Sequence, residues 1–180
     1  GYADMFAGRF DQAREKAKKA LSLGPNEYLT VVAVGDIEMY AGNYREAWRS
    51  FDKANRQSGH TVEMETKLAF VLRKLGDQKA SEKILDSTIS AHRGSLESLR
   101  EGSEIPYNIA AAYSMRGNPP EALRWLRKAF DLGYRDARGL LNDPLFEDAY
   151  SNDRFRTIAS ENDKSIQEMR TRVERESLNK

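Results

Sequence analysis

A glycine recurs every 34 residues in the first part of this 180-residue chain, at Gly8, Gly42 and Gly76. Five positions after each glycine stands a small residue, and these are Ala13, Ala47 and Ser81. Four positions further on come Ala17, Phe51 and Leu85. A fourth copy follows after a longer step and carries Gly117, Ala122 and Leu126. A repeat of this length predicts a stack of similar units, each covered by its neighbours.

The second copy shows how one unit folds. Its first half has apolar residues at helical spacing, namely Val31, Val34, Ile37 and Ala41. Gly42-Asn43 then interrupts the helix, because glycine tolerates the positive φ of a tight turn. The second half has its own apolar stripe of Ala47, Phe51 and Ala54. Each unit is therefore expected to be an antiparallel helix pair with one apolar face to bury.

These residues resemble the tetratricopeptide repeat, a 34-residue unit with W-x2-L-G-x2-Y, then A-x3-F, then P. The second copy has Val34-Gly35 and Ala47-x3-Phe51 at these places, and the fourth has Ile109-Ala110-x2-Tyr113 and Ala122-x3-Leu126. The resemblance covers residues 1–134. It implies an all-α fold, a right-handed superhelix of helix pairs (an α-solenoid) with capping helices at its C-terminal end.

The register predicts repeats at 1–27 (partial), 28–61, 62–95 and 103–134, then capping helices over 135–160 and an amphipathic helix over 161–180. The seven extra residues before the fourth copy predict a lengthened or kinked helix near Gly94. The first copy starts in mid-helix, and end repeats need a cap. We therefore expect that Gly1 is not the native start.

The segment after the repeats predicts three short helices, around Leu140-Leu141, Asp143–Phe146 and Asp153–Ile158. It resembles a tail that follows repeat arrays in bacterial multidomain proteins such as cyclases, kinases and transcription regulators. The resemblance implies that the tail closes the open end of the superhelix. Leu141, Leu145 and Ile158 are further apolar residues available to this cap. We expect Phe146 and Phe155 to be buried against the fourth repeat, with a structural role.

Composition excludes several classes of function. Lys and Arg number 29 against 28 Asp and Glu, so no excess charge indicates a nucleic-acid partner. The absence of cysteine excludes disulfides and thiol catalysis. His60 and His92 do not have the spacing of a metal pair, and no phosphate-binding loop is present. We predict no catalysis, no metal and no cofactor, and no membrane span. Cytoplasm and periplasm both remain possible compartments.

In the tetratricopeptide family the first helix of each pair lines the concave groove, which is where partners bind. The register places nine candidate groove residues there, and they are Tyr2, Phe6, Val32, Asp36, Tyr40, Phe70, Arg73, Tyr107 and Met115. Aromatic side chains dominate the energies of interfaces, which favours a binding role. The alternative is that some of them, including Tyr2, Val32 and Tyr107, pack between adjacent first helices.

The family's chaperone-binding members hold a C-terminal carboxylate with lysine, arginine and asparagine from successive first helices. The matching positions here are Val32, Asp36, Lys67, Glu104 and Asn108. Asn108 alone is of the right type in its own place, and Asp36 would repel a carboxylate. A chaperone C-terminus is therefore not an expected partner.

The sequence thus predicts a non-catalytic scaffold that holds a segment of a partner protein, extended or helical, in an apolar groove. The alternative is a C-terminal regulatory or dimerisation region of a larger bacterial enzyme or transcription regulator. The mid-helix start and the tail favour that alternative, and the identity of the partner is left open.

Overall fold

The computed structural model describes residues 1–92, 102–135 and 140–178, and in these ranges it contains helices and turns but no strand. The α-helices are α1 (Tyr2–Phe6), α2 (Phe10–Leu23), α3 (Tyr28–Tyr40), α4 (Tyr44–Ser58), α5 (Val62–Lys74), α6 (Gln78–His92), α7 (Glu104–Met115), α8 (Pro119–Asp131) and α9 (Asp153–Leu178). Two 3₁₀ helices, η1 (Leu140–Asn142) and η2 (Pro144–Ala149), precede α9. The predicted all-α fold is confirmed. None of the described helices is long and apolar enough to cross a membrane.

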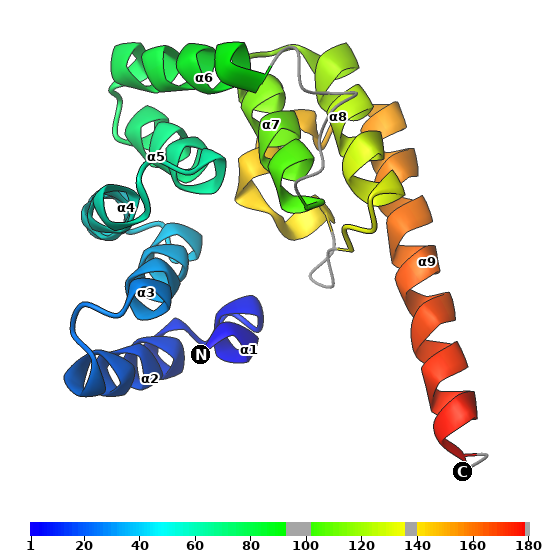
Figure 1. Ribbon diagram of the computed structural model, residues 1–180, viewed down its shortest axis with the longest axis horizontal. Coiled ribbons are helices and arrows are strands. Elements are labelled where there is room, and N and C mark those ends of the chain that lie inside the picture. Colours follow the sequence, from blue (N-terminus) through cyan, green and yellow to red (C-terminus); the bar gives the residue numbers. More distant parts are fainter. Residues whose placement is uncertain (93–101, 136–139, 179–180) are drawn as a thin grey trace. The chain divides into compact units, whose positions relative to one another are not determined.

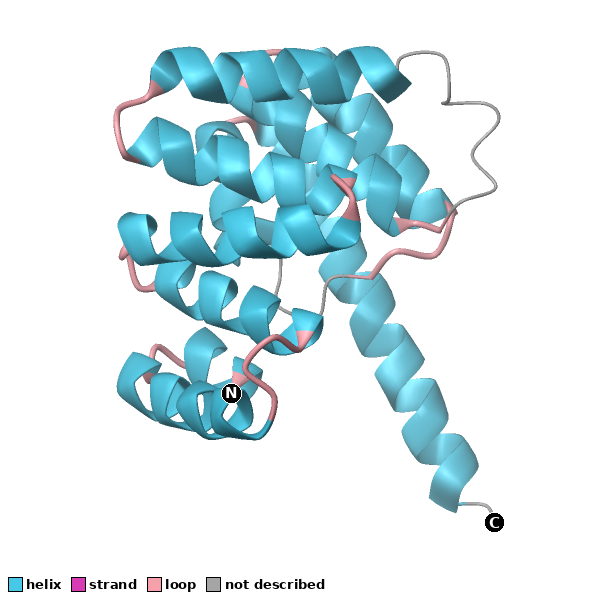
Figure 2. Cartoon of the chain, turned by 60° about the vertical axis from the view of Figure 1, so that its left-hand side comes forward, coloured by secondary structure: helices cyan, strands magenta, loops and turns pink. Residues whose placement is uncertain are grey.

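The chain divides into two compact units, Gly1–Ala91 and His92–Lys180. In unit 1, three helix pairs follow one another, α1 with α2, α3 with α4, and α5 with α6 (Figures 1 and 2). Figure 1 shows α1, α3 and α5 along one side of this unit and α2, α4 and α6 along the other. The first helices of the repeats therefore share one face, as the register predicts.

The recurring glycines lie at the turns between paired helices. Gly42, between α3 and α4, has a φ of +78°, and Gly8 and Gly76 occupy the same place with φ of +71° and +88°. Side chains with a Cβ rarely adopt this conformation, so the turn selects glycine in each repeat. The glycine recurs every 34 residues because each repeat has a turn at this place that requires a residue with positive φ.

Close contact between the helices of a pair rests on small residues. A Cβ built on Gly35 of α3 would lie 2.4 Å from Cε1 of Phe51, so the ring occupies the place of a side chain. Ala47 and Ala54 of α4 are completely buried beside it. In the second repeat, the Phe51 ring therefore packs directly against the backbone of α3 at Gly35, where the absence of a side chain leaves room for it.

Unit 2 contains the fourth helix pair and the tail. Asn118 caps α8 by accepting a hydrogen bond from the backbone N–H of Glu121, and Pro119 stands in its first turn. η2 packs on α7, and the start of α9 packs on α8. Phe146 and Phe155 are fully buried here with their ring centroids 5.5 Å apart, which confirms their predicted burial.

Three details of the tail differ from the prediction. The expected boundary at residue 161 is absent, because α9 runs unbroken from Asp153 to Leu178 in a stretch without glycine or proline. The segments around Leu140 and Pro144 are 3₁₀ helices. Leu140 is buried and Leu141 is exposed, so Leu140 supplies the apolar contact expected from Leu141. The kink expected near Gly94 and the end of the 62–95 repeat lie outside the described residues.

Candidate binding face

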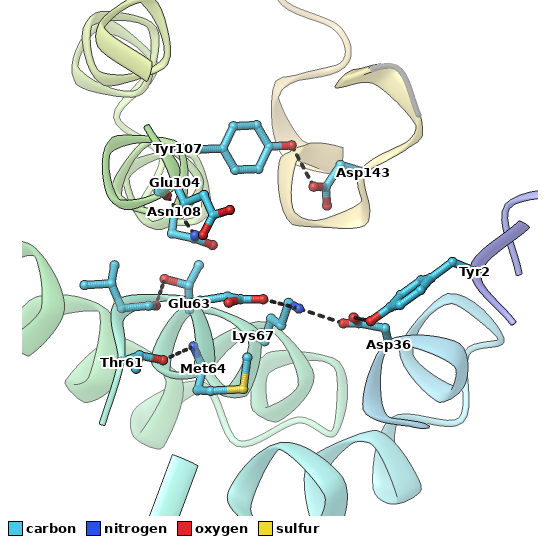
Figure 3. A network of polar contacts seen from close by, with 12 residues as sticks. Tyr2, Asp36, Thr61, Glu63, Met64, Lys67, Glu104, Tyr107, Asn108 and Asp143 are labelled. Carbon is cyan, nitrogen blue, oxygen red and sulfur yellow. Dashed lines mark hydrogen bonds and ion pairs between the residues drawn. The ribbon is translucent and has the colours of Figure 1, made fainter. Parts of the chain in front are cut away.

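A chain of polar contacts joins the first helices of three successive repeats in unit 1 (Figure 3). The Tyr2 hydroxyl on α1 donates a hydrogen bond to Oδ2 of Asp36 on α3 across 3.0 Å. Nζ of Lys67 on α5 lies 2.8 Å from Oδ1 of Asp36. The same ammonium donates to Oε1 of Glu63 at 2.7 Å. One carboxylate thus connects α1 to α5 across α3.

Asp36 and Lys67 are both buried, so their charges depend on each other. Burial alone disfavours the Lys67 ammonium, but the neighbouring carboxylates of Asp36 and Glu63 outweigh it and hold its pKa above the ordinary value. Burial of the hydroxyl end of Tyr2, together with the charge of Asp36, raises the pKa of that phenol. At neutral pH the lysine is therefore charged and Tyr2 is a hydrogen-bond donor.

Aromatic rings lie next to this polar chain. Tyr2 and Phe6 stack with ring centroids 6.1 Å apart, and Phe6 meets Tyr40 edge to face at 5.7 Å. Tyr2 is 45% exposed and Phe6 43%, while Tyr40 is half-buried. We call Tyr2, Phe6, Asp36, Tyr40, Glu63 and Lys67 together the first-helix face. It combines an accessible apolar surface with fixed hydrogen-bonding groups.

The first-helix face carries more negative than positive charge. Asp36 and Glu63 supply two carboxylates, and Lys67 supplies one ammonium between them. The Glu63 side chain is 42% exposed, whereas Lys67 is enclosed. An incoming group therefore meets a carboxylate first and has no direct access to the ammonium. The face favours donors and cations over anions.

Comparison with known proteins identifies the repeat. Residues 107–141 match the model of the tetratricopeptide repeat family, over α7, α8 and the start of the tail. These residues form a tetratricopeptide repeat. Repeats of this class are scaffolds for protein–protein contacts. No protein of curated function matches the sequence significantly.

Several solved structures resemble the chain in fold. "MamA MSR-1 C2" has 18% sequence identity and a TM-score of 0.46, with 72% of this chain and 71% of that chain covered. "Crystal structure of MamA" has 19% identity and a TM-score of 0.46, covering 96% and 95%. "Crystal structure of MamA protein" has 18% identity and a TM-score of 0.47, covering 93% and 90%. Similarity at this level says nothing about a shared partner.

Within the tetratricopeptide fold, the structure brings four of the predicted groove residues together, Tyr2, Phe6, Asp36 and Tyr40, all in unit 1. Two others of this unit are enclosed. Val32 is buried on α3. Phe70 is completely buried, with its ring edge to face against Tyr44. Phe70 therefore has no side-chain surface for an incoming segment in this conformation. Arg73 is half-buried in the last turn of α5.

Tyr107 and Met115 belong to unit 2, and both are buried there. The Tyr107 hydroxyl donates to Oδ2 of Asp143 at 2.7 Å, and its ring stacks on Tyr134 with centroids 4.1 Å apart. Its ring also meets Phe146 edge to face at 5.2 Å. In this unit Tyr107 holds the tail on α7, so it has a packing role, although against the tail and not between adjacent first helices.

Glu63 and Lys67 were absent from the predicted groove set, although the structure makes them central. Their spacing of four residues on one helix is the signal that could have included them, because such pairs face each other. The Asp36 contact across α3 has no such local signal. Because the Lys67 ammonium is already paired with Asp36 and Glu63, it is not available to a C-terminal carboxylate of a partner. This agrees with the expectation that a chaperone C-terminus is not a partner.

In the ranges that the structure describes, no group of three histidine, aspartate or glutamate side chains is arranged to hold a metal ion. His60 follows α4 with a positive φ of 67°, and its Nδ1 lies 2.9 Å from Nδ2 of Asn55. His60 therefore shapes the turn into α5.

Proposed function

We propose that the chain is a non-catalytic protein-interaction module and that the first-helix face of unit 1 holds a segment of a partner protein. The observation that carries the proposal is the position of two exposed aromatic rings, Tyr2 and Phe6, directly beside the Asp36–Lys67 pair. Exposed rings next to fixed polar groups form the usual surroundings of an interface anchor.

The chemistry of the face defines the segment that it would hold. Tyr2, Phe6 and Tyr40 offer ring faces and edges to an apolar side chain, and each buried aromatic anchor supplies roughly 2 kcal/mol or more. The exposed carboxylate of Glu63 suits a lysine or arginine next to that side chain. Such a cation would also gain from the neighbouring rings, by about 0.5–1 kcal/mol at an exposed site. The proposed ligand is thus a segment with an apolar residue beside a basic one.

Selection from a displayed library of random peptides tests this directly. Peptides that bind the parent chain are re-tested against Phe6→Ala with Tyr40→Ala, and separately against Glu63→Gln. Leu75→Ala is the matched control, because Leu75 is 42% exposed and lies after α5, outside the first-helix face. We expect selected peptides to share an apolar–basic pair, to lose about tenfold or more in affinity on the aromatic variant, and to bind the control normally.

The proposal fails if peptides bind the Phe6 and Tyr40 double variant as well as the parent. Acidic peptides as the dominant selected class would equally contradict it. Circular dichroism of each variant shows whether the helices are retained, so a loss of binding can be separated from a loss of fold.

The alternative role, a regulatory or dimerisation region of a larger enzyme or regulator, has one observation in its favour. Met169 and Val173 lie on the last turns of α9 with exposed side chains. Apolar residues at helical spacing in an otherwise charged helix are typical of a helix that contacts another protein surface.

A further inference from the structure

A mainly apolar pocket lies between α2 and α3 and is open to solvent. It has a volume of about 200 Å³. Its lining comes from these two helices only, namely Arg14, Ala17, Lys18, Leu21, Val34, Ile37 and Glu38. We call it the α2–α3 pocket. Asp36 and Glu38 are two positions apart on α3 and therefore point to opposite sides of that helix, so the pocket is separate from the first-helix face.

The repeat register shows which side chain the second repeat has in place of Ala17. Ala17 of α2 corresponds to Phe51 of α4, 34 positions later. The Phe51 ring is completely buried, and Nζ of Lys67 on the next helix, α5, lies 5.5 Å from its centroid. Ala17 offers only a methyl group at this position and is half-buried. The α2–α3 pocket therefore follows from a small side chain on α2 at a position where the second repeat has an aromatic ring beside a cation.

The guanidinium of Arg14 is held in a fixed orientation in the wall of this pocket. Its Nε donates to Oε1 of Glu38 at 2.8 Å, and its Nη2 donates to Oε2 at 2.9 Å. Its Nη1 donates to Oδ1 of Asp11 at 3.0 Å. Glu38 also accepts from Nδ2 of Asn43 at 2.7 Å, which fixes the carboxylate in turn. Since every nitrogen of the guanidinium already has an acceptor, its flat faces are the surfaces left for a further group.

The size and lining of the pocket suit one aromatic ring. An apolar cavity of about 150 Å³ accommodates a benzene molecule, whereas sites for larger small molecules usually exceed about 300 Å³. Leu21, Val34 and Ile37 supply apolar walls. The positive charge of the Arg14 guanidinium complements the electron-rich face of an aromatic ring. A leucine side chain would contact the same walls but would gain nothing from this charge.

We propose that the α2–α3 pocket binds the ring of a phenylalanine side chain from a partner protein, with the ring stacked on the guanidinium of Arg14. The pocket is then a second contact site of the chain, and it does not depend on binding at the first-helix face. The hydrogen bond from Arg14 holds the pKa of Glu38 below its ordinary value, so the ion pair that fixes the guanidinium is charged at neutral pH.

NMR titration of the isotope-labelled 180-residue chain tests the proposal with two small probes. N-acetyl-phenylalanine amide carries the ring, and N-acetyl-leucine amide is the matched aliphatic probe. Binding in the pocket should shift the methyl signal of Ala17 and the Nε–H signal of Arg14. The leucine probe should bind at least about threefold more weakly, because it cannot stack on the guanidinium.

Two variants separate the ring contact from the apolar walls. Arg14→Lys keeps the positive charge but removes the flat group, so the phenylalanine probe should bind only as weakly as the leucine probe. Val34→Phe places a ring of the chain's own in the pocket and should abolish the binding of both probes. The matched controls are Arg49→Lys on α4 and Val62→Phe on α5, both outside the pocket, and they should bind like the parent.

The double variant Phe6→Ala with Tyr40→Ala should leave the Ala17 shift unchanged, which separates this result from any binding at the first-helix face. Equal affinities for the two probes overturn the proposal, and so do shifts that occur only outside the pocket. An Arg14→Lys chain that binds the phenylalanine probe like the parent also overturns it. Circular dichroism shows whether each variant keeps its helices. If Val34→Phe does not fold, the partly exposed Arg14 position still decides the question.

Discussion

The hydroxyl of Tyr107 and the carboxylate of Asp143 meet inside unit 2 at 2.7 Å, although 36 residues separate them in sequence. Asp143 uses its other oxygen to cap η2 by accepting from the backbone N–H of Leu145 at 3.0 Å. Its backbone carbonyl accepts from the Tyr150 hydroxyl at 2.6 Å. One residue thus starts the tail helix and fastens it to α7, which explains why an aspartate precedes Pro144.

Replacement of Asp143 by alanine should destabilise unit 2 by about 2–3 kcal/mol, because the Tyr107 hydroxyl would lose its bond to this carboxylate and η2 would lose its cap. Tyr107→Phe removes the donor alone and should cost about 1 kcal/mol. Urea unfolding followed by the fluorescence of buried Trp125 measures both. Equal effects of the two substitutions would contradict the double role of Asp143.

The tail itself should behave as part of the core. Phe146→Ala and Phe155→Ala should each cost about 3–5 kcal/mol, because both rings are fully buried. Val173→Ala, at an exposed site on α9, should change stability by less than about 0.5 kcal/mol. Deletion of residues 140–180 should lower the melting temperature and cause association between chains. A truncated protein as stable and monodisperse as the parent would show that the tail is an appendage.

The fold could be predicted because its determinants are local and repeated. The glycine at each turn and the small–bulky–small stripe of each second helix appear in the sequence with one fixed step, so Gly42, Ala47 and Phe51 define a unit without any knowledge of its neighbours. The unbroken α9 is the opposite case. Charged residues favour a solvated helix but do not show whether it joins the helix before it.

The first-helix face was predictable only in part. Register places Tyr2, Phe6 and Asp36 on first helices, but it does not show which side chains remain accessible. Phe70 was assigned to the groove by the same register, yet α4 encloses it through Tyr44. The Asp36–Lys67 pair joins residues of two repeats at positions that differ by 31 residues, off the 34-residue step. Such a contact depends on side-chain length and burial, which a repeat pattern does not record.

Gly35→Ala tests the closeness of α3 and α4. Alanine favours a helix by about 1 kcal/mol over glycine, but its Cβ would overlap the Phe51 ring, so we expect a net loss of about 1–3 kcal/mol. Combining it with Phe51→Leu should cost less than the two separate changes together, because the smaller side chain leaves room for the methyl group. Thermal unfolding of the four proteins measures this coupling. Additive losses would mean that the ring and the glycine are independent.

Alkaline pH should weaken unit 1 through Tyr2 and Lys67. Both pKa values are raised in the folded protein, whereas the unfolded chain releases these protons near pH 10. Their contribution to stability is therefore complete below about pH 10 and is lost as the pH rises further. Urea unfolding at neutral and alkaline pH should show a smaller alkaline loss for Tyr2→Phe than for the parent. Parallel losses in both proteins would exclude Tyr2 as a source.

Asp36 accepts from Tyr2 on one oxygen and pairs with Lys67 on the other, so the carboxylate at the centre of the first-helix face already has donors of its own. A partner that seeks this carboxylate has to compete with the phenol, since the ammonium is enclosed. A neutral donor that replaces the Tyr2 hydroxyl at Asp36 gains no binding energy, because it exchanges one neutral hydrogen bond for another. A cationic donor gains the attraction of the carboxylate charge. In the binding role that we propose for this face, the Tyr2–Asp36 hydrogen bond therefore favours partners with a cationic donor over partners with a weak neutral one.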